Sequence, residues 1–239
     1  MTDEFGKLKK SEIIGGIIYW PFYLVLTSLV LTVIFTLLGV DVTAELGYYK
    51  LNVAFFAVNF LAIVGIFHHF LLEQLKTAAQ RPGRMVLMAV VAVCIYFAGM
   101  VAVSRLMAVL EALDIEVVNG NNDAVMDMAG AHFWPMLLMT VVLAPITEEC
   151  LCRGLIFGGL YSRSPFWAYA LSMAVFSAIH VAGYAFSQPV LITVVCFLQY
   201  LPAGFALAFA YRKSNTIWSA ILAHGAINLL SMLASRFIA

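Results

Sequence analysis

The sequence predicts an all-α polytopic membrane protein, on the basis of three observations. Of its 239 residues, 64% are hydrophobic and only 11% are charged, whereas a soluble domain carries about 25% charged residues. The hydrophobic residues form unbroken stretches long enough for about seven transmembrane helices. Basic residues are concentrated in alternate loops, which is typical of helices that cross a membrane in opposite directions.

The same composition excludes several classes of protein. A soluble globular enzyme and a disordered chain would both carry far more charge. A nucleic-acid binder would need a basic surplus to neutralise phosphates, and here 13 Lys and Arg balance 13 Asp and Glu. We therefore expect one membrane domain over residues 1–239, with a cytoplasmic N-terminus (1–12), N-terminal helices (13–131) and a motif-bearing catalytic core (132–235).

Seven apolar stretches define the predicted helices. They are continuous rather than alternating, which argues against barrel strands. The first follows three lysines, as in a signal peptide, but its length and the lack of a cleavage site indicate a retained anchor. The stretches cover residues 13–39, 51–72, 85–110, 132–160, 166–184, 190–211 and 216–235. An eighth or re-entrant segment is also compatible with the sequence.

The loop charges predict the orientation of these helices in the membrane. The N-terminus and the second, fourth and sixth loops carry the basic residues Lys7, Lys9, Lys10, Lys76, Arg81, Arg84, Arg163, Arg212 and Lys213. The third loop (111–130) carries five acidic residues instead. Because loops rich in Lys and Arg stay in the cytoplasm, the N-terminus is expected to be cytoplasmic. The expected location is the plasma (inner) membrane, or the ER membrane in a eukaryote.

Three charged residues lie deep inside the fourth apolar stretch. Ionisable groups at that depth are costly and are usually functional. Glu149 and Arg153 are four residues apart on a helix, so they share a face and can form an ion pair. Glu148 points about 100° away from Glu149 and is free to face another group. Pro145, just before them, is expected to distort the helix.

Polar residues in later stretches are placed to meet Glu148. His180 lies in the fifth stretch, and His224 and Asn228 share a face of the seventh. At 1.5 Å per residue, Glu148, His180 and His224 lie about 18, 21 and 12 Å from the cytoplasmic ends of their helices. A carboxylate, two imidazoles and a carboxamide that converge in one cavity would suit water activation.

These residues form three motifs that resemble a known family. Glu148-Glu149-x-x-x-Arg153, Phe176-x-x-x-His180 and His224-x-x-x-Asn228 occur in that order on three membrane helices. This pattern resembles the CPBP family, which includes CAAX proteases, bacteriocin-processing enzymes and the type II CAAX prenyl endopeptidase, or Ras-converting enzyme. The resemblance covers approximately residues 145–230 and implies a catalytic core in the last four helices.

The resemblance implies a role for each motif residue. Glu148 would be the general base that activates water, with His180 assisting, and His224 and Asn228 would complete the catalytic site. Asn228 could donate to the oxyanion of the tetrahedral intermediate. Glu149, Arg153 and Phe176 would have structural or substrate-binding roles: the Glu149–Arg153 pair would position the helix, or Arg153 would bind the C-terminal carboxylate of the substrate.

Metal dependence is left open by the sequence. Glu148, His180 and His224 would make a credible zinc-ligand set. However, Glu148 cannot easily be both ligand and base, and the sequence lacks the His-Glu-x-x-His helix of common zinc proteases. The sequence therefore favours a metal-independent glutamate-type hydrolase.

The resulting hypothesis is an intramembrane endopeptidase that cuts near the C-terminus of a membrane-associated protein or peptide. Its partners would be the lipid bilayer and that substrate, which is prenylated for family members that act on CAAX proteins. The active site is expected to be reached from the cytoplasmic side or laterally from lipid. Two alternatives are a non-catalytic membrane scaffold, such as a bacteriocin-immunity or signalling partner, and an ion transporter. A transporter would favour repeated halves with discontinuous helices, which the sequence does not show.

Overall fold

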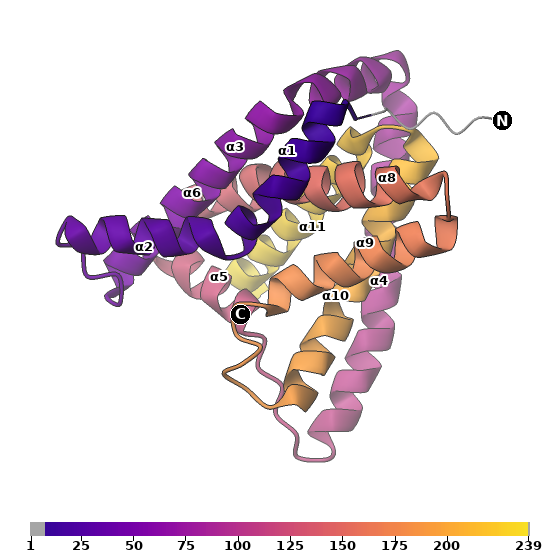
Figure 1. The fold of residues 1–239 in the computed structure, drawn as a ribbon. Helices are drawn as coiled ribbons and strands as arrows, with labels where there is room; N and C mark the ends of the chain where they lie inside the picture. The colour runs from indigo at the N-terminus through magenta and orange to yellow at the C-terminus, as the bar shows by residue number, and fades with distance from the viewer. Residues whose placement is uncertain (1–7, 239) are drawn as a thin grey trace.

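A computed structural model describes residues 8–238, and every regular element among them is a helix (Figure 1). The predicted all-α membrane class is therefore confirmed. Within the described residues, six segments are long and apolar enough to cross a membrane, and a shorter apolar helix, α9 (Pro165–Val181), accompanies them. Lys7 and the rest of residues 1–7 lie outside the described residues.

The first apolar segment is bent. It consists of α1 (Lys10–Pro21), the π-helical turn η1 (Phe22–Leu26) and α2 (Thr27–Leu37), and Figure 1 shows α1 and α2 meeting at a sharp angle. Pro21 stands at the bend, where its missing N–H weakens the helix. Two long helices follow, α3 (Glu45–Gln80) and α4 (Pro82–Glu111).

One helix was not predicted. The third loop contains α5 (Gly120–Ala131), which begins where the Asn119 side chain accepts a hydrogen bond from the Asn122 N–H at 3.3 Å. Its Met128 and Ala129 are buried in a small cluster with Met136, Met139 and Met232. Packing rather than apolar periodicity therefore determines this helix.

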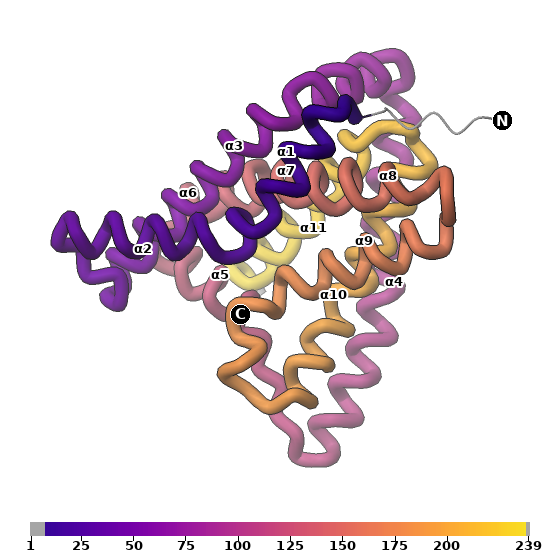
Figure 2. The backbone as a smooth tube through the Cα atoms, viewed as in Figure 1, coloured from indigo at the N-terminus to yellow at the C-terminus, as the bar shows by residue number. Residues whose placement is uncertain are grey.

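The motif-bearing helices run through the second half of the chain. One continuous helical segment comprises α6 (Phe133–Leu138), η2 (Met139–Leu143), α7 (Ala144–Glu149), η3 (Cys150–Phe157) and α8 (Gly158–Tyr161), and its path can be followed in Figure 2. The π-helical turn η2 ends at Leu143, two residues before Pro145, in agreement with the expected distortion. The chain ends with α9, α10 (Val190–Ser214) and α11 (Ile217–Ile238). The predicted fifth span reached residue 184, but α9 ends at Val181.

The two ends of the bundle differ. We call the end formed by Arg81 and residues 162–164 and 215–216 the turn end, and the end formed by residues 38–44, 112–119 and 182–189 the loop end. In Figures 1 and 2 the connections of the turn end lie toward the upper right, and those of the loop end lie to the left and below. At the turn end, the Ile217 N–H donates to Gln74 Oε1 at 2.8 Å, which ties α11 to α3.

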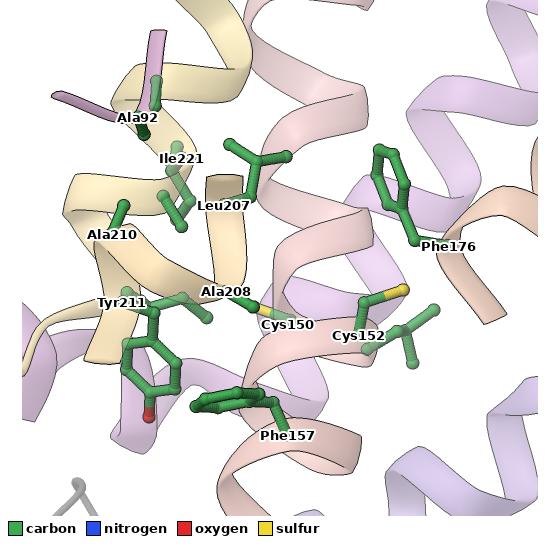
Figure 3. Close-up of a cluster of buried hydrophobic side chains, with 14 of the residues drawn as sticks. Ala92, Cys150, Cys152, Phe157, Phe176, Leu207, Ala208, Ala210, Tyr211 and Ile221 are labelled. Carbon is green, nitrogen blue, oxygen red and sulfur yellow. The ribbon is translucent and has the colours of Figure 1, made fainter. Parts of the chain in front are cut away.

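A hydrophobic core fills the half of the bundle near the turn end. Its large buried members include Phe67, Phe70, Leu151, Phe157 and Tyr211, all at most 1% exposed. Figure 3 shows Phe157 and Tyr211 close to Cys150 and Cys152 in this core. Closely packed apolar side chains therefore fill the space between the motif residues and the turn end.

Candidate active site

Three helices bring the predicted residues together at one cavity. Glu148 lies on α7, Phe176 and His180 on α9, and His224 and Asn228 on α11. All five line a cavity of about 460 Å³. The convergence expected from their depths along the helices is therefore present in the structure.

Glu148 is held between two imidazoles. Its Oε2 lies 3.6 Å from His180 Nε2 and 3.9 Å from His224 Nε2. This oxygen is buried and has no hydrogen-bond partner among the described residues. These separations exceed a direct hydrogen bond, so the three atoms face a shared space rather than one another.

The hydrogen bonds of the two Nδ1 atoms determine whether the two Nε2 atoms donate or accept. His180 Nδ1 lies 2.8 Å from the Phe176 carbonyl oxygen, and His224 Nδ1 lies 2.9 Å from Glu149 Oε1. A carbonyl or carboxylate oxygen accepts, so each Nδ1 is assigned the hydrogen. In the neutral rings both Nε2 atoms then present lone pairs toward Glu148. A water molecule placed between these three acceptors can donate its two hydrogens to two of them.

A buried ion pair lies next to the site, on the side away from the cavity. Arg153 Nη1 donates to Glu149 Oε1 at 2.9 Å, as the four-residue spacing predicts, and both side chains have no exposed surface. Arg153 Nη2 donates to the Gly204 carbonyl oxygen at 2.9 Å, and the guanidinium lies 4.4 Å from the Phe176 ring centre. Arg153 faces the interior of the bundle. Phe176 lines the cavity and lies between the cavity and Arg153.

Asn228 is fixed by an irregular stretch of backbone. Its Nδ2 donates to the Thr140 carbonyl oxygen at 2.7 Å, in the π-helical turn η2. One amide hydrogen is used in this bond, and the second remains for another acceptor.

Gly225 lets α11 approach η2 closely enough for that bond to form. A Cβ at Gly225 would lie only 2.6 Å from the Val141 carbonyl oxygen. We expect Gly225→Ala to push α11 away from η2, displace His224 and Asn228, and lower activity by on the order of 10²-fold, as misplacement of about 1 Å can do. Purified enzyme assayed beside Gly65→Ala, where a Cβ has no neighbour within 4 Å, checks this. Equal activity of the two variants would contradict it.

Sequence reasoning missed Tyr200 on α10, because it belongs to none of the three motifs. Its ring stacks on His180, with ring centres 4.4 Å apart and planes 30° apart. Its hydroxyl donates to Asn119 Oδ1 at 3.1 Å and accepts from Asn121 Nδ2 at 3.1 Å. Tyr200 thus connects the His180 ring to the start of α5.

Tyr200 is expected to act by positioning His180. Tyr200→Leu removes the stacked ring and should lower kcat about tenfold with little change in KM. Tyr200→Phe keeps the ring and should stay within about threefold of the wild-type kcat. Steady-state kinetics on both variants test this, and a rise in KM alone would instead assign Tyr200 to substrate binding.

The zinc-ligand set inferred from the sequence consists of Glu148, His180 and His224. The described residues contain no group of three His, Cys, Asp or Glu side chains arranged to hold a metal ion.

Comparison with known proteins supports the resemblance seen in the motifs. Residues 130–230 match the family model of the type II CAAX prenyl endopeptidase Rce1-like proteins. The chain is also similar to the Bacillus subtilis (strain 168) protein named "Putative membrane peptidase YdiL", with 30% identity over 109 residues. That match covers 45% of this chain and 40% of the relative, so the chain spans less than half of the relative it matches. No solved structure matches the chain.

Proposed function

Because residues 130–230 match a family of membrane endopeptidases and bring a buried carboxylate between two imidazoles, we propose that this protein is an intramembrane endopeptidase. It would hydrolyse a peptide bond near the C-terminus of a membrane-associated protein or peptide. The observation that carries the proposal is the unpartnered Glu148 Oε2, which faces two imidazole lone pairs inside a cavity. The partners are the bilayer and the substrate, with no nucleic acid.

The proposed reaction begins with a water molecule among Glu148 Oε2 and the two Nε2 atoms. Glu148 takes one proton as the water oxygen attacks the carbonyl carbon of the scissile bond, and His180 orients the water. The tetrahedral intermediate then collapses as its C–N bond breaks. Glu148 returns the proton to the departing amine, so the site ends in its starting protonation state.

The other motif residues support these steps. The second Asn228 amide hydrogen would donate to the developing oxyanion, without the cost of burying another charge. Glu149 holds His224 by its Nδ1 and is itself held by Arg153. Arg153 and Phe176 therefore act by positioning, and the interior position of Arg153 disfavours its binding of a substrate carboxylate.

This mechanism needs no metal, which chelation tests. We expect activity of the purified protein to survive extended EDTA treatment, with metal analysis confirming that the treated sample is metal-free. Loss of activity on chelation, with recovery on adding zinc, would contradict the mechanism. It would assign Glu148, His180 and His224 as ligands instead.

The proposed activity is tested by incubating wild-type protein with lipidated and unlipidated peptides that end in candidate cleavage sequences. Mass spectrometry of the products then reports the cleaved bond and the lipid requirement. We expect cleavage by wild-type protein and none by folded Glu148→Ala protein. Peptide binding without cleavage by either protein would instead support the non-catalytic scaffold.

A further inference from the structure

The cavity that contains Glu148 leads toward one end of the molecule. Its walls include Tyr48, Asn119, Asn122 and Gly183, which lie at or beside the loop end. Tyr48, Asn122 and Gly183 are exposed. Among the described residues, none in the ranges 57–95, 149–175 and 204–223 lines it. The cavity therefore opens toward the loop end, and lateral exposure at Leu24 in η1 and Ser28 in α2 extends the opening along these two elements.

The opposite direction is blocked. Phe67, Phe70 and Leu151 are at most 1% exposed and belong to the core beneath the site. Glu12 Oε1 accepts from the Phe70 N–H at 2.8 Å, so the start of α1 closes onto the same core. A peptide that approached from the turn end would have to pass through this packed layer.

The two ends of the bundle also carry opposite charge. Near the turn end, the described basic residues are Lys9, Lys10, Lys76, Arg81, Arg84, Arg163, Arg212 and Lys213, with Glu12 and Glu73 as the described acidic residues. Near the loop end, the acidic residues are Asp41, Glu45, Glu111, Asp114, Glu116, Asp123 and Asp127, with Lys50, Arg105 and Arg236 as the described basic residues. Because Lys- and Arg-rich ends remain in the cytoplasm, this distribution assigns the turn end to the cytoplasm.

Together these observations argue against cytoplasmic access, one of the two routes expected from the sequence. We propose that the site takes its substrate from the non-cytoplasmic side of the membrane, as an extended peptide segment displayed at that surface. This rests on the proposed endopeptidase function. The substrate class is then an exported peptide, or the outer part of a membrane protein, rather than the C-terminus of a prenylated cytoplasmic protein.

The mouth of the cavity has chemistry suited to such a segment. Asn121 and Asn122 each donate or accept one hydrogen bond with Tyr200, and the remaining donors and acceptors of their amide groups can pair with the amide groups of an extended main chain. Phe55 and other aromatic side chains line the deeper wall and can pack against apolar side chains of the segment. Apart from Glu148, no Asp, Glu, Lys or Arg side chain lines the cavity among the described residues.

Cysteine labelling in intact cells tests the orientation without any need for activity. The full chain carries Cys94→Ala, since Cys94 is exposed and the other three cysteines are buried, and then either Asn122→Cys at the mouth or Ser162→Cys at the turn end. A membrane-impermeant maleimide should label Asn122→Cys in intact cells and Ser162→Cys only after permeabilisation. The reverse pattern would overturn the proposal.

A second experiment tests access in the active protein. A peptide that the detergent-solubilised protein cleaves is presented to proteoliposomes of known orientation, on either the Asn122 side or the Ser162 side. We expect cleavage only from the Asn122 side. Cleavage only from the Ser162 side would overturn the proposal while leaving the protease intact. If no peptide is cleaved even in detergent, the proposed function fails, and labelling still decides the orientation.

Discussion

Replacement of Glu148 by Gln is expected to lower the rate of peptide-bond hydrolysis by about 10²- to 10⁴-fold, the usual contribution of a general base. Gln has nearly the same shape but cannot take a proton from water. The Glu148 Oε2 atom makes no hydrogen bond within the described residues, and the amide oxygen of Gln can still accept the hydrogen bond that the Tyr23 hydroxyl gives to Glu148. The loss should therefore fall on kcat, with the unfolding temperature close to that of the wild type.

The measurement is product formation followed by quantitative mass spectrometry with purified protein. Glu73→Gln is the matched control, because Glu73 is exposed on α3 and pairs only with Lys76 among the described residues. We expect the control to retain full activity. If Glu148→Gln retained activity within a few-fold of the wild type, the base would have to be another group, and the proposed mechanism would be wrong.

The second large effect concerns stability. Arg153→Met should lower the free energy of unfolding by about 3–5 kcal/mol, because it leaves the Glu149 carboxylate buried without its partner. Both side chains of this pair are 0% exposed. Met fills much of the volume of the Arg side chain, so loss of charge compensation dominates over loss of packing.

Reversible unfolding of detergent-solubilised protein measures this loss. The double variant Glu149→Gln/Arg153→Met removes both charges and should recover more than half of the lost free energy. Lys76→Met provides the control, because its pair with Glu73 is 69% and 49% exposed and should contribute less than about 1 kcal/mol. If the double variant were no more stable than Arg153→Met, the uncompensated charge would not be the cause.

Sequence alone predicted the membrane helices because the energetic demand of a bilayer is local: each span must be continuous and apolar. It missed α5 because residues 120–131 are short, rich in Gly, Asn and Asp, and lack an apolar stripe. Burial of Met128 and Ala129 against distant Met232 stabilises that helix, and such a contact has no local signature. The fifth span was predicted to end at residue 184 rather than at Val181 because Ala182, Gly183 and Tyr184 are compatible with either helix or turn.

The sequence predicted those residues of the candidate site that are polar or charged but lie inside an apolar span. Glu148, His180 and His224 stand out for that reason, and helix geometry placed them at similar depths. The link from Glu149 to His224 was not predictable, since 75 residues separate them and Glu149 already had a partner in Arg153. Tyr200 gave no signal either, because its role depends on how α10 rotates against α9.

The contrast between an open cavity on one side of Glu148 and a packed core on the other has an electrical consequence. Water that filled the cavity from the adjoining solution would carry the potential of that solution to the carboxylate, so most of any transmembrane voltage would fall across the packed half. A charge that crossed the full membrane would change in energy by about 2.3 kcal/mol per 100 mV. A proton that exchanges between Glu148 and the cavity crosses only a small part of that field. The proposed chemistry of the site would thereby be insulated from the voltage across the surrounding membrane.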